Sequence, residues 1–336
     1  MSDSTLDRAL ATLLGGAIGD ALGMPSQTFD PATIFAQYGR ITGFVDPAPG
    51  HPISHGLRAG MVTDDTEQTL LLARLLIAGK GRLNPENWAA ALLDWERDVQ
   101  RRGLRDLLGP SSKAALLALQ SGVPATHTGR SGTTNGAAMR IAPVAIATPP
   151  DAVRIVDAVA AACRVTHDTG EAIAAASAVA MVISQGIDGT SFDAAQPLAL
   201  RAARLGNQRG AAVGEPDMAA RITLALSIAD RGDAAQLAAQ IGTSVASRAS
   251  VACAFGVVRL AKGDPWQAAL IAANIGDDTD TIAAIACAMA AACAGLSALP
   301  KDKVEQVIAA NALNLAPLVS GLLVLRLAQP ALPVLP

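Results

Sequence analysis

Two short acidic motifs in the 336-residue sequence carry the clearest chemical signal. TDDT occupies residues 63–66 and DDTDT occupies residues 277–281, and each precedes an apolar segment with helical spacing. One Asp or Thr side chain is enough to cap a helix, whereas adjacent carboxylates add repulsion that a divalent cation such as Mg²⁺ would relieve. Residue types alone leave a metal site, a calcium-type loop and plain capping open, although the EF-hand pattern of Gly and Glu is absent.

Two glycine-containing motifs would allow another backbone or a ligand to come close. GGAIGDALG at residues 15–23 places glycines inside an apolar helix, which lowers stability unless the space is needed. No strand precedes this motif, so it is a weak match to a dinucleotide fingerprint, and we interpret Asp20 as a structural or supporting carboxylate. SGTTNGAAMR at residues 131–140 indicates either an ordinary turn or a loop whose amides meet a phosphate or ribose.

Single polar residues near these motifs have two interpretations each. Arg140 could pair with a ligand phosphate or with an acidic motif, and His167 opens an Ala-rich helix as a ligand contact, a cap or a core residue. His51 and His55 share four-residue spacing, but Pro52 disfavours a helix there, so zinc ligation is a weak match and an entrance position is the alternative. No Ser/His/Asp set or reactive Cys signature is present.

Composition excludes several classes of protein. The net charge is −3 and only 16% of the residues are charged, which argues against a nucleic-acid binder. Residues 281–300 and 315–336 are almost free of charge, yet the first stretch is mostly Ala, so we expect a buried helix rather than a membrane span. The start lacks a secretory signal, and the four cysteines form no CxxC pair. These features predict a cytoplasmic protein with reduced cysteines.

Helical spacing recurs along nearly the whole chain, and this predicts an all-α, compact multi-helix bundle in a single domain, residues 1–336. The longest segment without clear helical spacing is 23–66, apart from a short helix near 31–39, and such long loops are usually functional or disordered. The expected helices are 6–22, 67–78, 85–101, 112–120, 137–147, 151–164, 170–185, 192–205, 216–229, 235–241, 247–261, 265–274, 280–295 and 301–313.

Five motifs, GGAIGDALGMP, TDDTEQTL, TTNGAAMR, THDTGEA and GDDTDT, occur in the order typical of the ADP-ribosylglycohydrolase family, and the sequence resembles the dinitrogen-reductase-activating glycohydrolases from about residue 6 to 313. The resemblance implies an all-α fold, two divalent cations, Mg²⁺ or Mn²⁺, and hydrolysis of an N- or O-ribosidic bond. The substrate would be an ADP-ribosylated protein or a small ribosylated molecule. The implied metal ligands are Thr63, Asp64, Asp65, Asp278, Asp280 and Thr281. The implied substrate-binding residues are Asp20, Ser131, Gly132, Thr134, Asn135, Gly136, Met139, Arg140 and His167.

One departure from the family's pattern concerns proton transfer. Enzymes of this family that act on modified proteins often have Glu where this chain has Gln27, and glutamine cannot shuttle a proton. We therefore expect Asp64, Asp65 or Asp106 to orient a metal-bound water, and we count Gln27 with them among the expected catalytic residues. Two smaller departures, Thr134 and Asp277, replace glycines. Gln27 leaves an alternative open, a nucleoside or nucleotide N-ribohydrolase, and a binding or structural member without catalysis is a third hypothesis.

Overall fold

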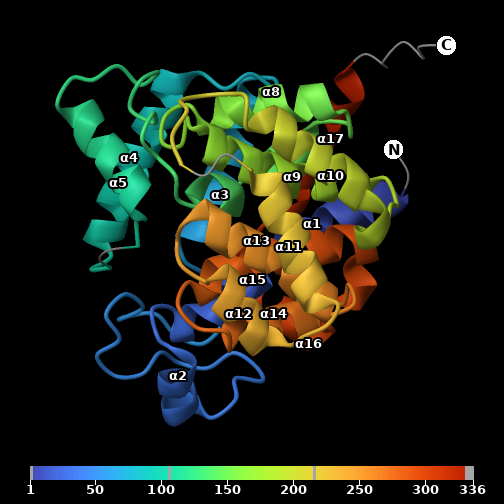
Figure 1. Cartoon of the computed structure of the whole chain (residues 1–336). Coiled ribbons are helices and arrows are strands. Elements are labelled where there is room, and N and C mark those ends of the chain that lie inside the picture. Colours follow the sequence, from blue (N-terminus) through green and yellow to red (C-terminus); the bar gives the residue numbers. More distant parts are fainter. Residues whose placement is uncertain (1–2, 105–106, 215–216, 330–336) are drawn as a thin grey trace.

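The computed structural model describes residues 3–104, 107–214 and 217–329, and these segments form helices joined by loops, as Figure 1 shows. The prediction of an all-α fold is confirmed, because the described segments contain no β-strand, only two isolated bridges, Thr134 with Ala246 and Thr169 with Ala211. The α-helices are α1 (Asp3–Gly23), α2 (Pro31–Tyr38), α3 (Asp64–Ala78), α4 (Pro85–Arg101), α5 (Pro110–Gln120), α6 (Gly136–Met139), α7 (Ala142–Ala147), α8 (Ala152–Cys163), α9 (Gly170–Ile187), α10 (Phe192–Gly206), α11 (Met218–Ala229), α12 (Ala234–Ile241), α13 (Ser247–Leu260), α14 (Pro265–Ala273), α15 (Thr279–Ala294), α16 (Lys301–Asn311) and α17 (Ala316–Ala328). Short 3-10 turns are η1 (Met24–Ser26) and η2 (Leu296–Ala298).

Three differences from the expected helices have identifiable causes. The helix expected over 137–147 is interrupted between α6 and α7, because Pro143 lacks an amide hydrogen and its ring disfavours a continuous turn at that point. Arg140 lies in this interruption. Helix α3 begins at Asp64 rather than at residue 67, so both aspartates of TDDT belong to its first turn. The apolar segment after residue 315 forms α17, a helix that the sequence analysis missed.

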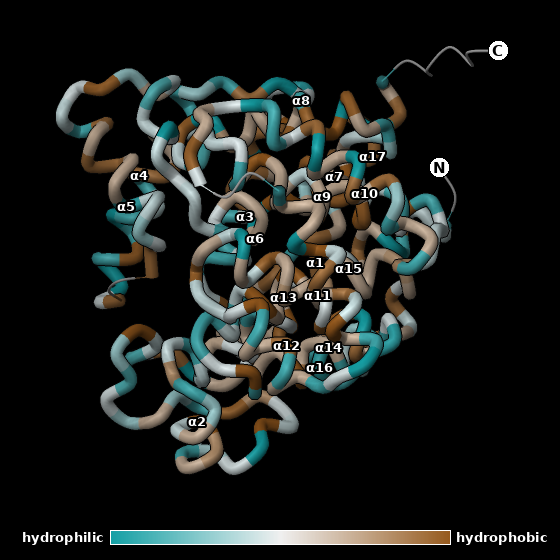
Figure 2. Tube along the Cα trace, viewed as in Figure 1, coloured by the Kyte–Doolittle hydropathy of each residue, from teal (hydrophilic) through white to brown (hydrophobic). Residues whose placement is uncertain are grey.

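The centre of the bundle consists of α1, α9 and α15, and Figure 2 shows apolar segments running through this region. Every residue of α9 is buried, as are Thr279–Ala292 of α15. Helix α9 is long and apolar enough to cross a membrane, and α16 with α17 would pass the same test as one span bent by 101°. The burial of α9 inside the bundle identifies it as a core helix.

The glycines of the first motif allow α1 and α15 to pack against each other in antiparallel directions. A Cβ on Gly19 would lie 2.2 Å from the carbonyl oxygen of Ala283, and one on Gly23 would lie 2.4 Å from that of Thr279. At these two positions, the close approach of the α15 backbone therefore explains why the residue is glycine. The contact places the start of α15, with the second acidic motif, beside the end of α1.

Two peripheral parts flank the bundle on one side in Figure 1. The hairpin of α4 and α5 stands apart from the body, and the long segment around α2 forms a second projection. The predicted loop over 23–66 and its short helix near 31–39 correspond to η1, α2 and their connections, except that Gly23 belongs to α1 and residues 64–66 belong to α3. Both peripheral parts contribute residues to the pocket described next.

Candidate functional site

Both acidic motifs open into one pocket with a volume of about 180 Å³. Its walls come from the loop after α1, the start of α3, the α4–α5 connection, the loop into α6 and the start of α15. Nine of the residues singled out from the sequence line it: Gln27, Asp64, Thr134, Asn135, Gly136, Met139, Asp278, Asp280 and Thr281. The other lining residues, which sequence reasoning did not assign to the site, are Thr28, Ile53, Leu107, Leu108, Gly109, Pro110, Ser112 and Val245.

The capping interpretation fails at both acidic motifs. The N-cap residues there are Thr63 and Asp278, and neither side chain accepts a capping hydrogen bond from a backbone amide of its own helix. Eight other helices do have such a cap, made by Asp30, Asn84, Asp151, Thr169, Ser191, Asp217, Asp233 and Asp264. The acidic side chains of the two motifs are thus free of the ordinary capping role.

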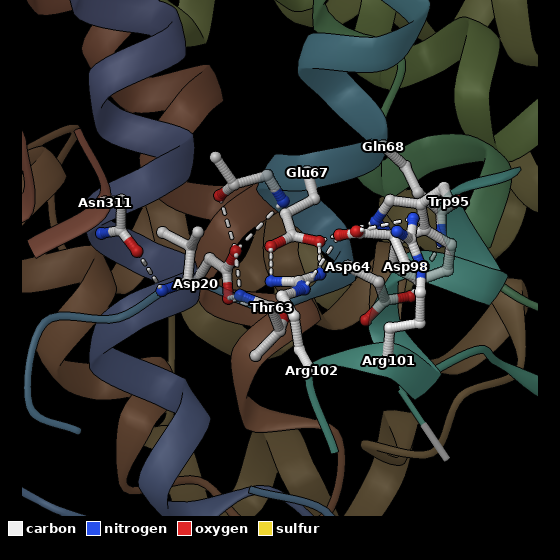
Figure 3. A network of polar contacts seen from close by, with 12 residues as sticks. Asp20, Thr63, Asp64, Glu67, Gln68, Trp95, Asp98, Arg101, Arg102 and Asn311 are labelled. Atoms are coloured by element: carbon white, nitrogen blue, oxygen red, sulfur yellow. Dashed lines mark hydrogen bonds and ion pairs between the residues drawn. The ribbon is translucent and has the colours of Figure 1, made fainter. Parts of the chain in front are cut away.

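Asp20 of α1 supplies the cap that α3 lacks. Its fully buried carboxylate accepts hydrogen bonds of 3.0 Å from the amides of Thr63 and Thr66 and bonds of 2.7 and 2.5 Å from their hydroxyls. Figure 3 shows Asp20 reaching Thr63 from the neighbouring helix. Because its hydrogen bonds among the described residues all come from the first motif, Asp20 holds that motif in place, as expected for a structural carboxylate. It does not line the pocket.

Two buried carboxylate oxygens in this cluster have no hydrogen-bond partner within the described residues. They are Oδ1 of Asp65 and Oδ1 of Asp280. The other oxygen of Asp65, Oδ2, accepts from Thr281 at 3.3 Å, so it links the two motifs, and the hydroxyl oxygen of Thr63 lies 3.5 Å from it. Orphaned buried acceptors are costly, and they indicate a missing partner such as a cation.

Burial disfavours the charged form of every carboxyl group in the cluster, and repulsion from neighbouring aspartates adds to this effect at all of them except Asp20. Burial, and secondly nearby aspartates, raise the pKa of Asp64, Asp65 and Asp280 well above the usual range. Burial also raises the pKa of Asp278 to about 7, and that of Asp20 to about 6 despite its hydrogen bonds from threonines. Cations bound among these groups would hold them in the ionised form.

The residues present fit a divalent cation. They offer carboxylate and hydroxyl oxygens, which Mg²⁺ and Mn²⁺ prefer, and two of the oxygens lack other partners. Within the described segments, no three His, Cys, Asp or Glu side chains already converge as a complete ligand set. The fit therefore rests on the chemistry of the donors and on the orphaned oxygens.

A buried arginine supports Asp64 from behind. Arg140 donates to Oε1 of Gln68 at 2.5 Å, and Nε2 of Gln68 donates to Oδ2 of Asp64 at 3.3 Å. The guanidinium also contacts Trp88, with 5.3 Å from Cζ to the ring centre, and donates to the hydroxyl of Thr166. Arg140 does not line the pocket, so its observed contacts connect it to the acidic motif through Gln68 rather than to a ligand.

His167 is also buried behind the pocket. Its Nε2 lies 3.0 Å from the hydroxyl of Thr134, and its Nδ1 lies 2.7 Å from that of Thr166. Burial, and secondly the charge of Arg140, hold the pKa of His167 well below its usual value, so the ring is neutral. A Cβ on Gly136 would lie 2.9 Å from its Cε1, and this explains the glycine. His167 thus supports the wall formed by Thr134 and Gly136.

The loop before α6 forms that wall. Asn135 donates from its amide group to Asp278 and, at 2.8 Å, to the hydroxyl of Ser250, which the sequence analysis did not identify. Gly132 does not line the pocket. A Cβ on Gly132 would lie 2.0 Å from the carbonyl oxygen of Thr166, and the neighbouring Ser131 is exposed. The loop thus divides into a part facing the pocket and a part packed against the α8–α9 turn.

An ion-pair network joins α3 to α4 on the side away from Asp20. Glu67 accepts two hydrogen bonds of 2.7 Å from Arg102 and one of 2.7 Å from the indole of Trp95, as Figure 3 shows. Residues 107–110, which follow α4, line the pocket, so this network anchors one of its walls. Asp106, an expected catalytic residue, lies outside the described residues.

Comparison with known proteins gives one consistent result. A family model described as ADP-ribosylglycohydrolase matches residues 1–329. The chain is 33% identical over 265 residues to the uncharacterised protein YegU of Escherichia coli K12, covering 77% of this chain and 79% of that protein. It is 36% identical over 175 residues to the ADP-ribosyl-[dinitrogen reductase] glycohydrolase of Rhodospirillum rubrum, covering 49% of this chain and 53% of that enzyme. A solved structure titled ADP-ribosylglycohydrolase-related protein complex shares the fold, with a TM-score of 0.68, 24% identity and coverage of 96% and 98%.

Proposed function

The chain belongs to the ADP-ribosylglycohydrolase family, and from this premise we propose that it is a metal-dependent hydrolase that releases ADP-ribose from a modified side chain or small conjugate. Membership makes it a glycosyl hydrolase for substrates of the ADP-ribose type, in a family that generally depends on metal ions. The observation that carries the metal-dependent mechanism is the pair of orphaned oxygens on Asp65 and Asp280 within one acidic cluster.

Six residues of the two motifs would hold two divalent cations, Mg²⁺ or Mn²⁺. The first motif contributes the hydroxyl of Thr63 with the carboxylates of Asp64 and Asp65. The second contributes Asp278 and Asp280 with the hydroxyl of Thr281. When bound, such ions polarise ribose oxygens and lower the pKa of a coordinated water. The ligand set is supported by the meeting of both motifs through Thr281 and Asp65.

The chain's own residues supply the proton transfer and the electrostatics. Asp64 faces the pocket and takes a proton from the attacking water through a carboxylate oxygen. The oxygen of that water bonds to the anomeric carbon as the bond from that carbon to the leaving N or O breaks, and Asp64 returns the proton to the leaving group. Asp278 and Asp280 stabilise the positive charge that develops on the ribose ring. The backbone at Asn135 and Gly136 contacts the ribose or diphosphate.

One experiment tests this proposal directly. Purified protein is treated with chelator, then reconstituted with Mg²⁺ or Mn²⁺ and incubated with an ADP-ribosyl-arginine peptide, an ADP-ribosyl-serine peptide and a panel of nucleosides. We expect release of ADP-ribose that requires the added cation. Turnover of nucleosides alone would contradict the proposal, as would full activity in the presence of the chelator.

A further inference from the structure

Gln27 reaches the pocket because two distant loops pair beneath it. The amide of Thr28 donates to the carbonyl oxygen of Asp277 at 2.7 Å, and the amide of Asp277 donates to that of Phe29 at 2.8 Å. Asp277 has φ of +63°, a left-handed conformation that favours glycine but that Asp tolerates. This pairing holds Gln27 at the pocket beside the acidic start of α15.

A chain of hydrogen bonds determines which way the Gln27 amide points. Nε2 of Gln27 donates to Oγ of Ser54 at 3.0 Å, and the Ser54 hydroxyl donates its only hydrogen to the carbonyl oxygen of Met24 at 2.7 Å. Ser54 therefore has no hydrogen left to give to Gln27 and can only accept from it. The NH₂ group must face Ser54, and Oε1 is left without a hydrogen-bond partner among the described residues.

His51 fixes the same residue through its backbone. Nδ1 of His51 accepts from the amides of Ser54 at 2.8 Å and Ile53 at 3.2 Å, so the ring hydrogen lies on Nε2. Nε2 lies 3.1 Å from the carbonyl oxygen of Gln27 and donates to it. His51 and Ser54 are both buried, and the His51 ring packs against Phe29 with 4.7 Å between ring centres. Gln27 is thus held at its backbone and at its amide group.

We propose that Oε1 of Gln27 is a fixed hydrogen-bond acceptor for the group on the anomeric carbon of the bound ribose, with Ser54 and His51 as its positioning residues. This inference rests on the proposed function, in which the acidic motifs take the ions and the ring hydroxyls. The donor left for Gln27 is then the N–H or O–H at the anomeric carbon. Since an amide oxygen cannot take up a proton here, Gln27 selects the substrate and leaves proton transfer to Asp64.

The inference predicts discrimination between two ligands that differ in one donor. Calorimetry with saturating Mn²⁺ compares ADP-ribose, which has an anomeric hydroxyl, with its anomeric methyl ether, which has none. The wild-type protein should bind ADP-ribose about tenfold more tightly, the value of one hydrogen bond. In Gln27→Met, which keeps the length of the side chain but loses the acceptor, this ratio should fall by about tenfold.

Two further variants separate positioning from simple packing. Gln27→Glu keeps an acceptor and should retain the wild-type ratio, whereas Ser54→Ala lets the amide rotate and should give an intermediate ratio. Circular dichroism and thermal unfolding check that each variant is folded. An unchanged ratio in both Gln27→Met and Ser54→Ala would overturn the inference while leaving the proposed function intact. Failure of the wild-type protein to bind ADP-ribose would contradict the proposed function and, with it, this inference.

Discussion

The hydroxyl of Thr281 donates a hydrogen bond of 3.3 Å to Oδ2 of Asp65, joining residues 216 positions apart in the sequence. This contact brings the start of α15 against the start of α3. Oδ1 of Asp65 has no hydrogen-bond partner among the described residues, and neither has Oδ1 of Asp280. The two acidic motifs therefore form one electrostatic unit.

The same substitution should have opposite effects at two buried aspartates. Asp20→Asn replaces an acceptor of four hydrogen bonds from threonines with a group that also carries donors, and it should lower the free energy of unfolding by about 2–4 kcal/mol. Asp280→Asn removes repulsion and, without metal, should raise that free energy by about 1 kcal/mol. Urea unfolding at pH 8 with chelator measures both.

The Asp280→Asn variant should also lose Mn²⁺ binding and more than about 99% of the hydrolase activity, because a ligand change costs more than the 10–100-fold typical of supporting residues. Calorimetry and ADP-ribose release measure these losses. Wild-type cation affinity in Asp280→Asn would exclude this residue from the ligand set.

The metal-free protein should become less stable as the pH rises from 6.5 to 8. The pKa values of the acidic cluster are raised in the folded state, to about 7 for Asp278, so the folded state binds more protons than the unfolded state in this window. The stabilisation that these protonated carboxyl groups contribute is fully present below the unfolded pKa of 3.8 and is lost as the pH rises through their folded pKa values. His51 and His167, whose pKa values are lowered from 6.5 in the folded state, oppose this slope near pH 6.5, where the unfolded histidines are still partly protonated. Their contribution becomes small above about pH 7.5.

Added Mg²⁺ or Mn²⁺ should reverse this trend, since cations compete with protons for the same carboxylates and bind more tightly as the pH rises. Thermal unfolding is measured at half-unit pH steps, once with chelator and once with about 5–10 mM cation, a concentration chosen to saturate the site. A chelated protein whose stability is flat or increasing over this window would contradict the raised pKa values.

Two neighbouring glycines should respond differently to the same added methyl group. In Gly19→Ala the new Cβ would lie 2.2 Å from the carbonyl oxygen of Ala283, so α1 and α15 must separate at a cost of about 3 kcal/mol or more. In Gly16→Ala the nearest atom would lie 3.8 Å away, and the higher helix propensity of Ala should stabilise the protein by about 0.5–1 kcal/mol. Urea denaturation distinguishes the variants, and similar stabilities would contradict the described α1–α15 contact.

Gln68 should matter to cation binding although it does not line the pocket. Gln68→Ala removes the link through which Arg140 orients Asp64, and we expect cation affinity to fall about 10–100-fold. Gln196→Ala is a matched control, because Gln196 is also buried but, within the described segments, its one hydrogen bond goes to the carbonyl oxygen of Phe192 in the same helix, α10. Calorimetric titration with Mn²⁺ compares the two, and equal affinities would remove Gln68 from the support of the site.

The sequence by itself determined the helical fold and the residue types of the site. Helical spacing and capping residues act over one or two turns, so most helices could be predicted from local pattern, and the acidic motifs stood out in a chain with few charges. The interruption at Arg140 also has a local cause, Pro143, so it too is predictable from the sequence.

Only the tertiary structure decided which aspartate does what. Asp20 and Asp280 are both buried carboxylates, yet one accepts four hydrogen bonds from another helix and the other keeps an orphaned oxygen. The orientation of the Gln27 amide likewise depends on Ser54 and Met24, and the position of Arg140 behind Asp64 depends on Gln68. Such partners are chosen by the packing of helices distant in sequence, chiefly α1 against α15, and local pattern contains no information about that packing.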